Sequence, residues 1–234
     1  ELPNGSTAYV GISPEEAKLD ELLSNLVELR DKYYPEKEVW LTEFGWDTNQ
    51  SYATSTSSHA YAEYTGRQVQ AMWLTRAYLL LSASGIDKAD MYMCEDVGVE
   101  EESVGKYGTC GVIGFEYDEN GALVEVKKDS YYYLYTLKNA LNGYTFQEKV
   151  EAYDENVMIY KYETENGKTA YAVWCKTSDG TKSENYQLRI DGDTATLIEA
   201  VYGDIDGVSS SLTADELGYV SVDVSENPVY VIVD

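Results

Sequence analysis

The chain has 234 residues, with 17 Lys and Arg against 42 Asp and Glu, which gives a formal net charge of −25. Nucleic-acid binding needs clustered basic side chains, so the scattered Lys and Arg argue against a nucleic-acid partner and equally against an anionic membrane surface. No apolar run reaches the roughly 20 residues of a membrane-spanning helix. Apolar residues make up 44% of the chain, which predicts a folded globular protein.

Residues 1–146 combine helical periodicity with short strand patterns. Ser13 is placed to cap a first helix, Pro14 suits its first turn, and apolar residues at helical spacing extend it to about Tyr34. The stretch 39–44 is predicted to be a strand buried on both faces, with Trp40 in the core. A loop that begins with Gly45 follows.

Further elements are predicted after this strand. In chain order they are a polar loop over 47–60, a helix over 61–84 ended by Gly85, a strand over 89–94 with Tyr92 in the core, a loop that carries Glu95 and Asp96, a hairpin over 112–127 that turns at Asn120-Gly121, and a helix over 130–142. Strands that alternate with long helices indicate parallel βα units.

Residues 147–234 have a different pattern. Seven short alternating strands are predicted, near 149–153, 157–163, 169–176, 185–190, 195–202, 219–224 and 228–233, many of them separated by Gly-containing turns. Such spacing is typical of an antiparallel β-sandwich, with Tyr171 and Trp174 in its core. No aromatic platform for carbohydrate is recognisable in it. We therefore predict two domains, residues 1–146 (α/β) and 147–234 (all-β).

The cysteine and histidine content indicates no metal site and no cofactor motif. Cys94, Cys110 and Cys175 lack the spacing of a metal site or a disulfide framework. Either Cys94 pairs with Cys110 or all three are buried thiols, and both alternatives stay open. The single histidine, His59, lies in a Ser/Thr-rich loop without the partners of a catalytic triad.

Glu43 is the most informative carboxylate in the sequence. It lies near the C-terminal end of the predicted buried strand, where burial costs free energy unless the group is paired. In parallel α/β folds the catalytic groups lie at these strand ends. Position alone leaves two alternatives, a catalytic carboxylate or a strand-end Glu that reaches solvent.

The motif Trp40-Leu-Thr-Glu-Phe-Gly45 resembles strand seven of the clan A retaining glycoside hydrolases, which are (β/α)8 barrels. The resemblance covers about residues 10–146 and, more loosely, the β-sandwich. A helix with Gln70, Trp73, Arg76 and Tyr78 resembles the seventh barrel helix. Met91-Tyr92 resembles part of strand eight, and Ser130–Leu134 resembles the last helix.

The resemblance implies that Glu43 is the nucleophile that forms a covalent glycosyl-enzyme. The acid/base of the family is a Glu at the end of strand four, and the chain contains no such segment. The expected fold is therefore the terminal part of a (β/α)8 barrel, with the last two βα units and a preceding helix, followed by the β-sandwich. Trp46 either stacks on sugar or packs in its loop, and Asp47, Glu95 and Asp96 either hydrogen-bond sugar hydroxyls or are solvated.

The function expected from this resemblance is that of the C-terminal part of a retaining glycoside hydrolase acting on poly- or oligosaccharides. Alone, the chain is expected to be inactive, and to bind its missing N-terminal barrel half or itself. The alternative is a non-catalytic carbohydrate-binding or interaction protein. Sugar, linkage and compartment stay open, although a polysaccharide substrate favours an extracellular location.

Overall fold

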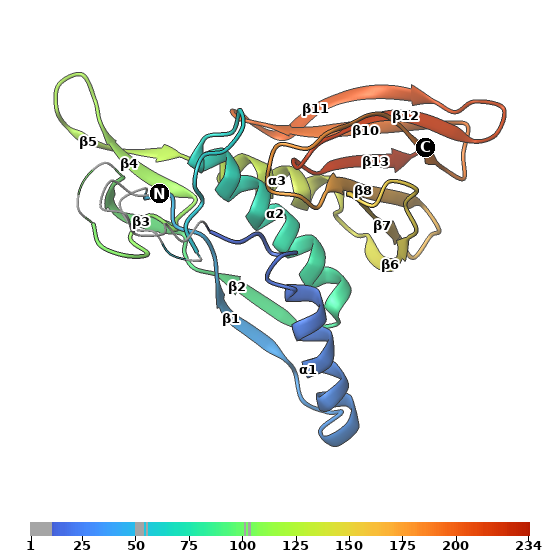
Figure 1. Cartoon of the computed structure of the whole chain (residues 1–234), viewed down its shortest axis with the longest axis horizontal. Helices are drawn as coiled ribbons and strands as arrows, with labels where there is room; N and C mark the ends of the chain where they lie inside the picture. Colours follow the sequence, from blue (N-terminus) through green and yellow to red (C-terminus); the bar gives the residue numbers. More distant parts are fainter. Residues whose placement is uncertain (1–10, 50–53, 55, 101, 103) are drawn as a thin grey trace. The chain divides into compact units, whose positions relative to one another are not determined.

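A computed structural model of the chain describes residues 11–49, 54, 56–100, 102 and 104–234 (Figure 1). The chain divides into two compact units, residues 1–131 and 132–234. This boundary lies earlier than the one predicted at 146/147, and the functional assignment of the two parts stays a prediction. Within the described residues, no helix is long and apolar enough to cross a membrane.

The first helix, α1 (Leu19–Tyr33), begins later than predicted. Ser13 caps a separate turn: its Oγ accepts from Glu16 N at 3.2 Å, and its own N donates to Glu16 Oε2 at 3.0 Å. Lys18 then adopts a left-handed conformation, with φ of 51°, immediately before α1. This residue separates the capped turn from the helix, because a left-handed residue cannot continue a right-handed helix.

The second helix, α2 (Gly66–Ser84), packs against α1 and forms the core of the first unit. The predicted start at Tyr61 is wrong, because Thr65 is the N-cap and forms a capping box with Gln68. Tyr61 and Tyr64 instead form a tight backbone bridge ahead of the helix. The predicted C-terminal cap is confirmed, since Gly85 has a left-handed φ of 79°.

Two parallel strands, β1 (Trp40–Phe44) and β2 (Lys88–Met91), lie beside these helices (Figure 1). Their parallel pairing agrees with the predicted βα units. The prediction that β1 is buried on both faces is wrong, however, because Trp40, Thr42 and Glu43 are exposed. Among the described strands β1 pairs with β2 alone, so its second edge forms no ladder with another described strand.

A three-stranded sheet completes the first unit, in the order β3-β4-β5 (Glu95–Val99, Ile113–Tyr117 and Leu123–Lys127). The predicted hairpin is confirmed as β4–β5, and Asp118 Oδ1 accepts from two backbone amides of its turn. The predicted loop that carries Glu95 and Asp96 is wrong, because both residues lie in β3. This stretch is a strand because it pairs with β4, which lies later in the sequence. Such a pairing is not visible in the local sequence.

Helix α3 (Asp129–Ala140) runs from the first unit into the second, which otherwise consists of antiparallel strands. A six-stranded sheet has the order β11-β10-β13-β8-β7-β6, and a two-stranded sheet has the order β12-β9. The strands are β6 (Thr145–Val150), β7 (Val157–Glu163), β8 (Thr169–Cys175), β9 (Ser183–Arg189), β10 (Thr194–Val201), β11 (Asp204–Thr213), β12 (Tyr219–Val224) and β13 (Val229–Val233).

The two sheets of the second unit share one hydrophobic core. Ile159 and Val173 of the six-stranded sheet contribute to it, as do Leu188 and Val222 of the two-stranded sheet. Tyr171 and Trp174 are buried, as predicted. Strand β11 was not predicted, because it is an edge strand with exposed Ser side chains and so carries no pattern of alternating burial.

Candidate functional site

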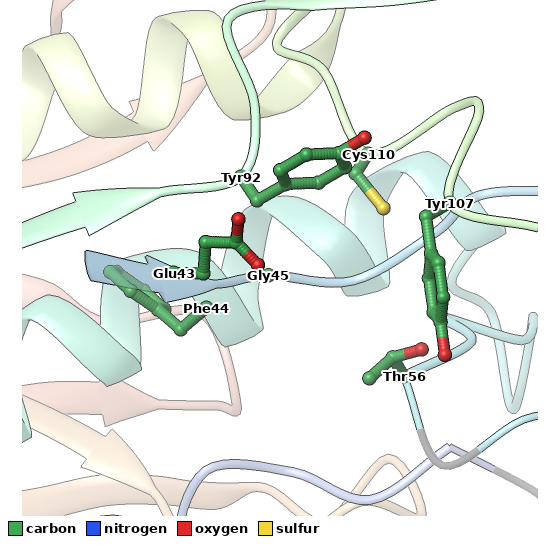
Figure 2. Close-up of a pocket in the computed structure, with 7 residues that line it drawn as sticks. All are labelled: Glu43, Phe44, Gly45, Thr56, Tyr92, Tyr107 and Cys110. Carbon is green, nitrogen blue, oxygen red and sulfur yellow. The ribbon is translucent and has the colours of Figure 1, made fainter. Parts of the chain in front are cut away.

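Glu43 lines a pocket of about 330 Å³ in the first unit. The pocket is formed by the end of β1 and by three loops, with Phe44, Gly45, Thr56, Tyr92, Tyr107 and Cys110 as its other lining residues (Figure 2). Glu43 extends from β1 toward Tyr92, which directly follows β2. The C-terminal ends of two parallel neighbouring strands therefore meet at this pocket.

The carboxylate of Glu43 is exposed and available to a ligand. Among the residues that the structure describes, none forms a hydrogen bond or an ion pair with it. Tyr92, predicted to be a core residue, is instead 38% exposed. The sequence left open whether Glu43 is catalytic or simply reaches solvent, and the structure places the exposed carboxylate in a pocket.

Gly45 allows the ends of β1 and β2 to approach closely. A Cβ atom at this position would lie 2.3 Å from the carbonyl oxygen of Tyr92, far inside van der Waals contact. The Tyr92 amide donates to the carbonyl of Phe44 at 2.7 Å, which extends the parallel pairing past the strand ends. Close approach thus sets the position of Tyr92 relative to the end of β1.

Asp47 is a positioning residue of the loops rather than a direct sugar ligand, which corrects the prediction. Its side chain is 2% exposed. Oδ2 accepts from the Tyr107 amide at 2.6 Å, and Oδ1 accepts from the Asn49 amide at 3.0 Å and from the Thr109 hydroxyl. Tyr107 adopts a left-handed φ of 63°, so this hydrogen bond holds an unfavourable backbone conformation at the pocket wall.

Trp46 packs inside its loop, which corrects the alternative of sugar stacking. The side chain is 6% exposed, and Nε1 donates to the carbonyl of Ile12 at 2.9 Å. Its ring meets Trp73 of α2 edge-on, with 5.8 Å between ring centroids. At this low exposure the indole has no free face on which a sugar could stack.

Asp96 forms a buried ion pair with Lys128, which corrects its prediction as a substrate ligand. The two side chains are 1% and 0% exposed, and Lys128 Nζ lies 3.1 Å from Asp96 Oδ2. Lys128 also donates to Thr48 Oγ1 and to the carbonyl of Thr109, and Asp96 Oδ1 accepts from the Gly111 amide. Burial raises the pKa of Asp96 to about 6 and lowers the pKa of Lys128.

Glu95 is exposed on β3 and does not line the pocket, so its role in sugar binding stays a prediction. All three cysteines are free thiols, which excludes the Cys94–Cys110 pairing. Cys94 is exposed, against the expectation of three buried thiols. Cys110 is buried at the pocket wall, and burial raises the pKa of its thiol to about 12.

The sequence interpretation missed most of the pocket wall. Thr56, Tyr107 and Cys110 come from loops, and a loop residue carries no periodicity that would assign it to a site. Tyr92 was predicted to lie inside a strand over 89–94, whereas β2 ends at Met91 and leaves Tyr92 at the strand end. Among the described residues, no group of three or more His, Cys, Asp or Glu is arranged to hold a metal ion.

Neither a protein-family model nor a curated protein matches the sequence. Among solved structures, a family 39 glycoside hydrolase from the gut symbiont Bacteroides cellulosilyticus WH2 superposes with a TM-score of 0.61 at 21% identity, over 91% of this chain and 38% of that one. The chain shares its fold with glycoside hydrolases of clan A.

Two further solved structures also superpose on this chain. A GH30 endoxylanase from Clostridium papyrosolvens C71 gives a TM-score of 0.51 at 10% identity, over 90% of this chain and 45% of that one. CelM2, a bifunctional glucanase-xylanase protein from a metagenome library, gives a TM-score of 0.51 at 16% identity, over 93% of this chain and 34% of that one. The predicted resemblance is thus confirmed for the fold, and the chain spans less than half the length of these glycoside hydrolases.

Proposed function

We propose that the chain supplies the nucleophile side of the active site of a retaining glycoside hydrolase acting on poly- or oligosaccharides. In this proposal the first unit is the terminal part of a (β/α)8 barrel, and the second unit is its β-sandwich. The observation that carries the proposal is the exposed, unpaired carboxylate of Glu43, at the C-terminal end of a parallel strand and inside a pocket.

The proposed reaction has two steps. Glu43 attacks the anomeric carbon, and the bond from that carbon to the leaving oxygen breaks as a second carboxylic acid protonates that oxygen. The same second group then removes a proton from water, the water oxygen bonds to the anomeric carbon, and the Glu43 carboxylate is released. The two carboxyl groups of a retaining pair lie about 5–5.5 Å apart. The second group is proposed to come from a segment outside this chain.

Two tyrosines would support the nucleophile. Tyr92 lies on the side of the pocket toward which Glu43 extends, and its hydroxyl points toward the Cys110 side, where it would donate to a sugar oxygen. Tyr107 and Thr56 carry hydroxyls on the facing wall (Figure 2), where they would bind sugar hydroxyls. Asp47 would act through Tyr107, because its carboxylate holds the Tyr107 amide.

An apolar stripe on α1 supports the proposal that more of a barrel covers this unit. Leu22, Leu26 and Leu29 are 65%, 47% and 54% exposed, and their spacing places them on one face of the helix. Three leucines on one face form a larger apolar patch than a single surface leucine does, and three of the five residues of β1 are exposed in the same unit. We propose that the missing barrel half, or a second copy of the chain, covers it.

The test uses the longest polypeptide that the reading frame encodes, assayed on a panel of aryl β-glycosides and polysaccharides. Glu43→Gln is expected to lower kcat/KM by about 10³-fold or more, because the variant cannot form the glycosyl-enzyme. Glu125→Gln is the matched control, since Glu125 is also an exposed strand Glu of the first unit. It should keep the parent activity.

Two chemical readouts identify the role of Glu43. Azide should restore turnover to Glu43→Ala by attacking the anomeric carbon in place of the carboxylate, which yields a glycosyl azide of inverted configuration. A 2-deoxy-2-fluoro glycoside with a good leaving group should add its sugar mass to the peptide that contains Glu43. Hydrolysis at the parent rate by Glu43→Gln, or polysaccharide binding without any turnover, would overturn the proposal and favour a non-catalytic protein.

A further inference from the structure

Tyr153 presents a bare aromatic face on the second unit. It lies in the loop between β6 and β7, and its side chain is 70% exposed. Its ring lies flat on the ring of Tyr186 of β9, with 4.4 Å between centroids and an angle of 2° between planes. Tyr186 is 2% exposed and belongs to the hydrophobic core. One face of Tyr153 is therefore packed and the other is open.

The orientation of the Tyr153 ring is fixed at its far end as well. Its hydroxyl accepts a hydrogen bond from the backbone amide of Gln187 in β9, at 3.0 Å. Just before Tyr186, the pairing of β9 with β12 is irregular, and Asn185 has a left-handed φ of 54°. The Asn185 amide donates to Asp223 Oδ1 at 2.8 Å, which holds this irregularity in place. Stacking of a ligand would therefore cost the Tyr153 side chain little conformational entropy.

We propose that Tyr153 is the platform of a carbohydrate-binding site on the second unit, separate from the pocket at Glu43. The ligand class is a neutral polysaccharide of β-linked pyranoses. Glucose and xylose in this linkage carry axial C–H groups on both ring faces, and such a flat apolar face fits against an aromatic ring whose other face is packed. The sequence interpretation recognised no aromatic platform here, because the stacking of Tyr153 on Tyr186 arises only in the folded chain.

Polar groups beside the ring suit sugar hydroxyls. The Tyr153 hydroxyl uses an oxygen lone pair to accept from Gln187, so its own hydrogen remains free to donate. The Gln187 side chain is exposed, and its Nε2 donates to the carbonyl of Asn185 at 2.9 Å, which leaves the amide oxygen as an acceptor. The ring therefore carries a free donor at its own edge, and an exposed acceptor lies on the neighbouring strand.

The charge around the ring favours a neutral ligand. Asp154 and Glu155 follow Tyr153 in the same loop, and a groove of about 380 Å³ beside this loop is lined by Glu151, Lys149 and Lys176 as well. Carboxylates outnumber the lysines there, and the whole chain carries −25. An anionic polysaccharide would be repelled.

A purely structural role explains only part of this geometry. By accepting from the Gln187 amide, Tyr153 satisfies a donor on the free edge of β9. Edge protection needs the hydroxyl, but it does not require a large ring to remain 70% exposed. The two roles predict different outcomes for Tyr153→Phe, which keeps the ring and loses the hydroxyl.

Affinity electrophoresis of the 234-residue chain tests the proposal, in gels that contain hydroxyethyl cellulose, neutral xylan or polygalacturonate. The parent chain should be retarded by a neutral β-linked polysaccharide and not by polygalacturonate. Tyr153→Ala should weaken that binding about tenfold or more, whereas Tyr153→Phe should retain most of it. Circular dichroism confirms that each variant is folded.

Two controls separate this site from other causes. Tyr202→Ala removes a second tyrosine of the same unit that is 65% exposed, and Glu125→Gln alters an exposed strand residue of the first unit. Both should bind as the parent does. The proposal is overturned if neither neutral polysaccharide retards the parent, if folded Tyr153→Ala binds normally, if Tyr202→Ala loses binding equally, or if polygalacturonate is preferred.

Discussion

The two units differ in how completely they bury their sheets. In the second unit, β8 has six of its seven residues buried, and side chains from two sheets close a common core. In the first unit, the two-stranded sheet of β1 and β2 has no buried residue, although 13 of the 19 residues of α2 are buried. The second unit thus encloses its own core, whereas the first leaves its proposed catalytic strand partly exposed. Three predictions test this difference.

The largest effect is expected in the core of the second unit. Trp174 is fully buried and meets Tyr160 edge-on, with 5.1 Å between centroids. Trp174→Ala should lower the free energy of unfolding by about 3–5 kcal/mol, because it leaves a large cavity. Urea unfolding followed by circular dichroism measures this loss. A loss below about 1 kcal/mol would mean that the core is not closely packed.

An intermediate, pH-dependent effect is expected at Asp96 in the first unit. Its pKa, about 6, lies above the ordinary value of 3.8, so the folded state binds more protons than the unfolded state between these two pH values. The stability that Asp96 contributes should therefore fall as pH rises from about 4 to about 6, and then level off. The difference between wild type and Asp96→Asn isolates this contribution from the other acids.

Urea unfolding of both proteins at pH 4, 5, 6 and 7 gives the required comparison. The stability of wild type relative to Asp96→Asn should decrease over that series, by up to about 3 kcal/mol. A relative stability that rises with pH would instead show that pairing with Lys128 outweighs burial and lowers the pKa of Asp96.

The smallest effect is expected on the exposed face of α1. Leu22→Ala should change the stability of the 234-residue chain by less than about 0.5 kcal/mol, because Leu22 is 65% exposed. Leu23, the next residue, is 5% exposed, and Leu23→Ala should cost about 2–5 kcal/mol. In the longer polypeptide, Leu22→Ala should become costly if a further segment covers it. Equal costs for both variants in the 234-residue chain would contradict the exposed face.

Local signals account for the parts of the fold that the sequence predicted. The hairpin depends on Asn120-Gly121, and the end of α2 depends on Gly85, whose left-handed conformation suits glycine. Helix starts were less predictable, because several polar residues precede each helix and the backbone selects one cap. Thr65 is selected for α2 because it and Gln68 satisfy one another.

The sequence predicted Glu43 as a site residue, but it did not predict that the nearby acids Asp47 and Asp96 are buried. A carboxylate in a polar stretch looks solvated, and its burial depends on partners far away in the sequence. Lys128 lies 32 residues beyond Asp96, and Thr109 lies 62 residues beyond Asp47. Only the folded chain brings these groups together. The structure is therefore needed to distinguish the exposed carboxylate of Glu43 from the buried carboxylates of Asp47 and Asp96.

The contact at Gly45 has a consequence for protein design. A design could move the nucleophile to a new scaffold as a single Glu. Here, however, the strand end beside that Glu lies against the neighbouring backbone, and a Cβ atom at position 45 would lie 2.3 Å from the Tyr92 carbonyl oxygen. Any other residue at position 45 would force the two strand ends apart and carry Tyr92 away with them. The smallest transferable form of this half-site is therefore Glu43 together with its glycine and the neighbouring strand.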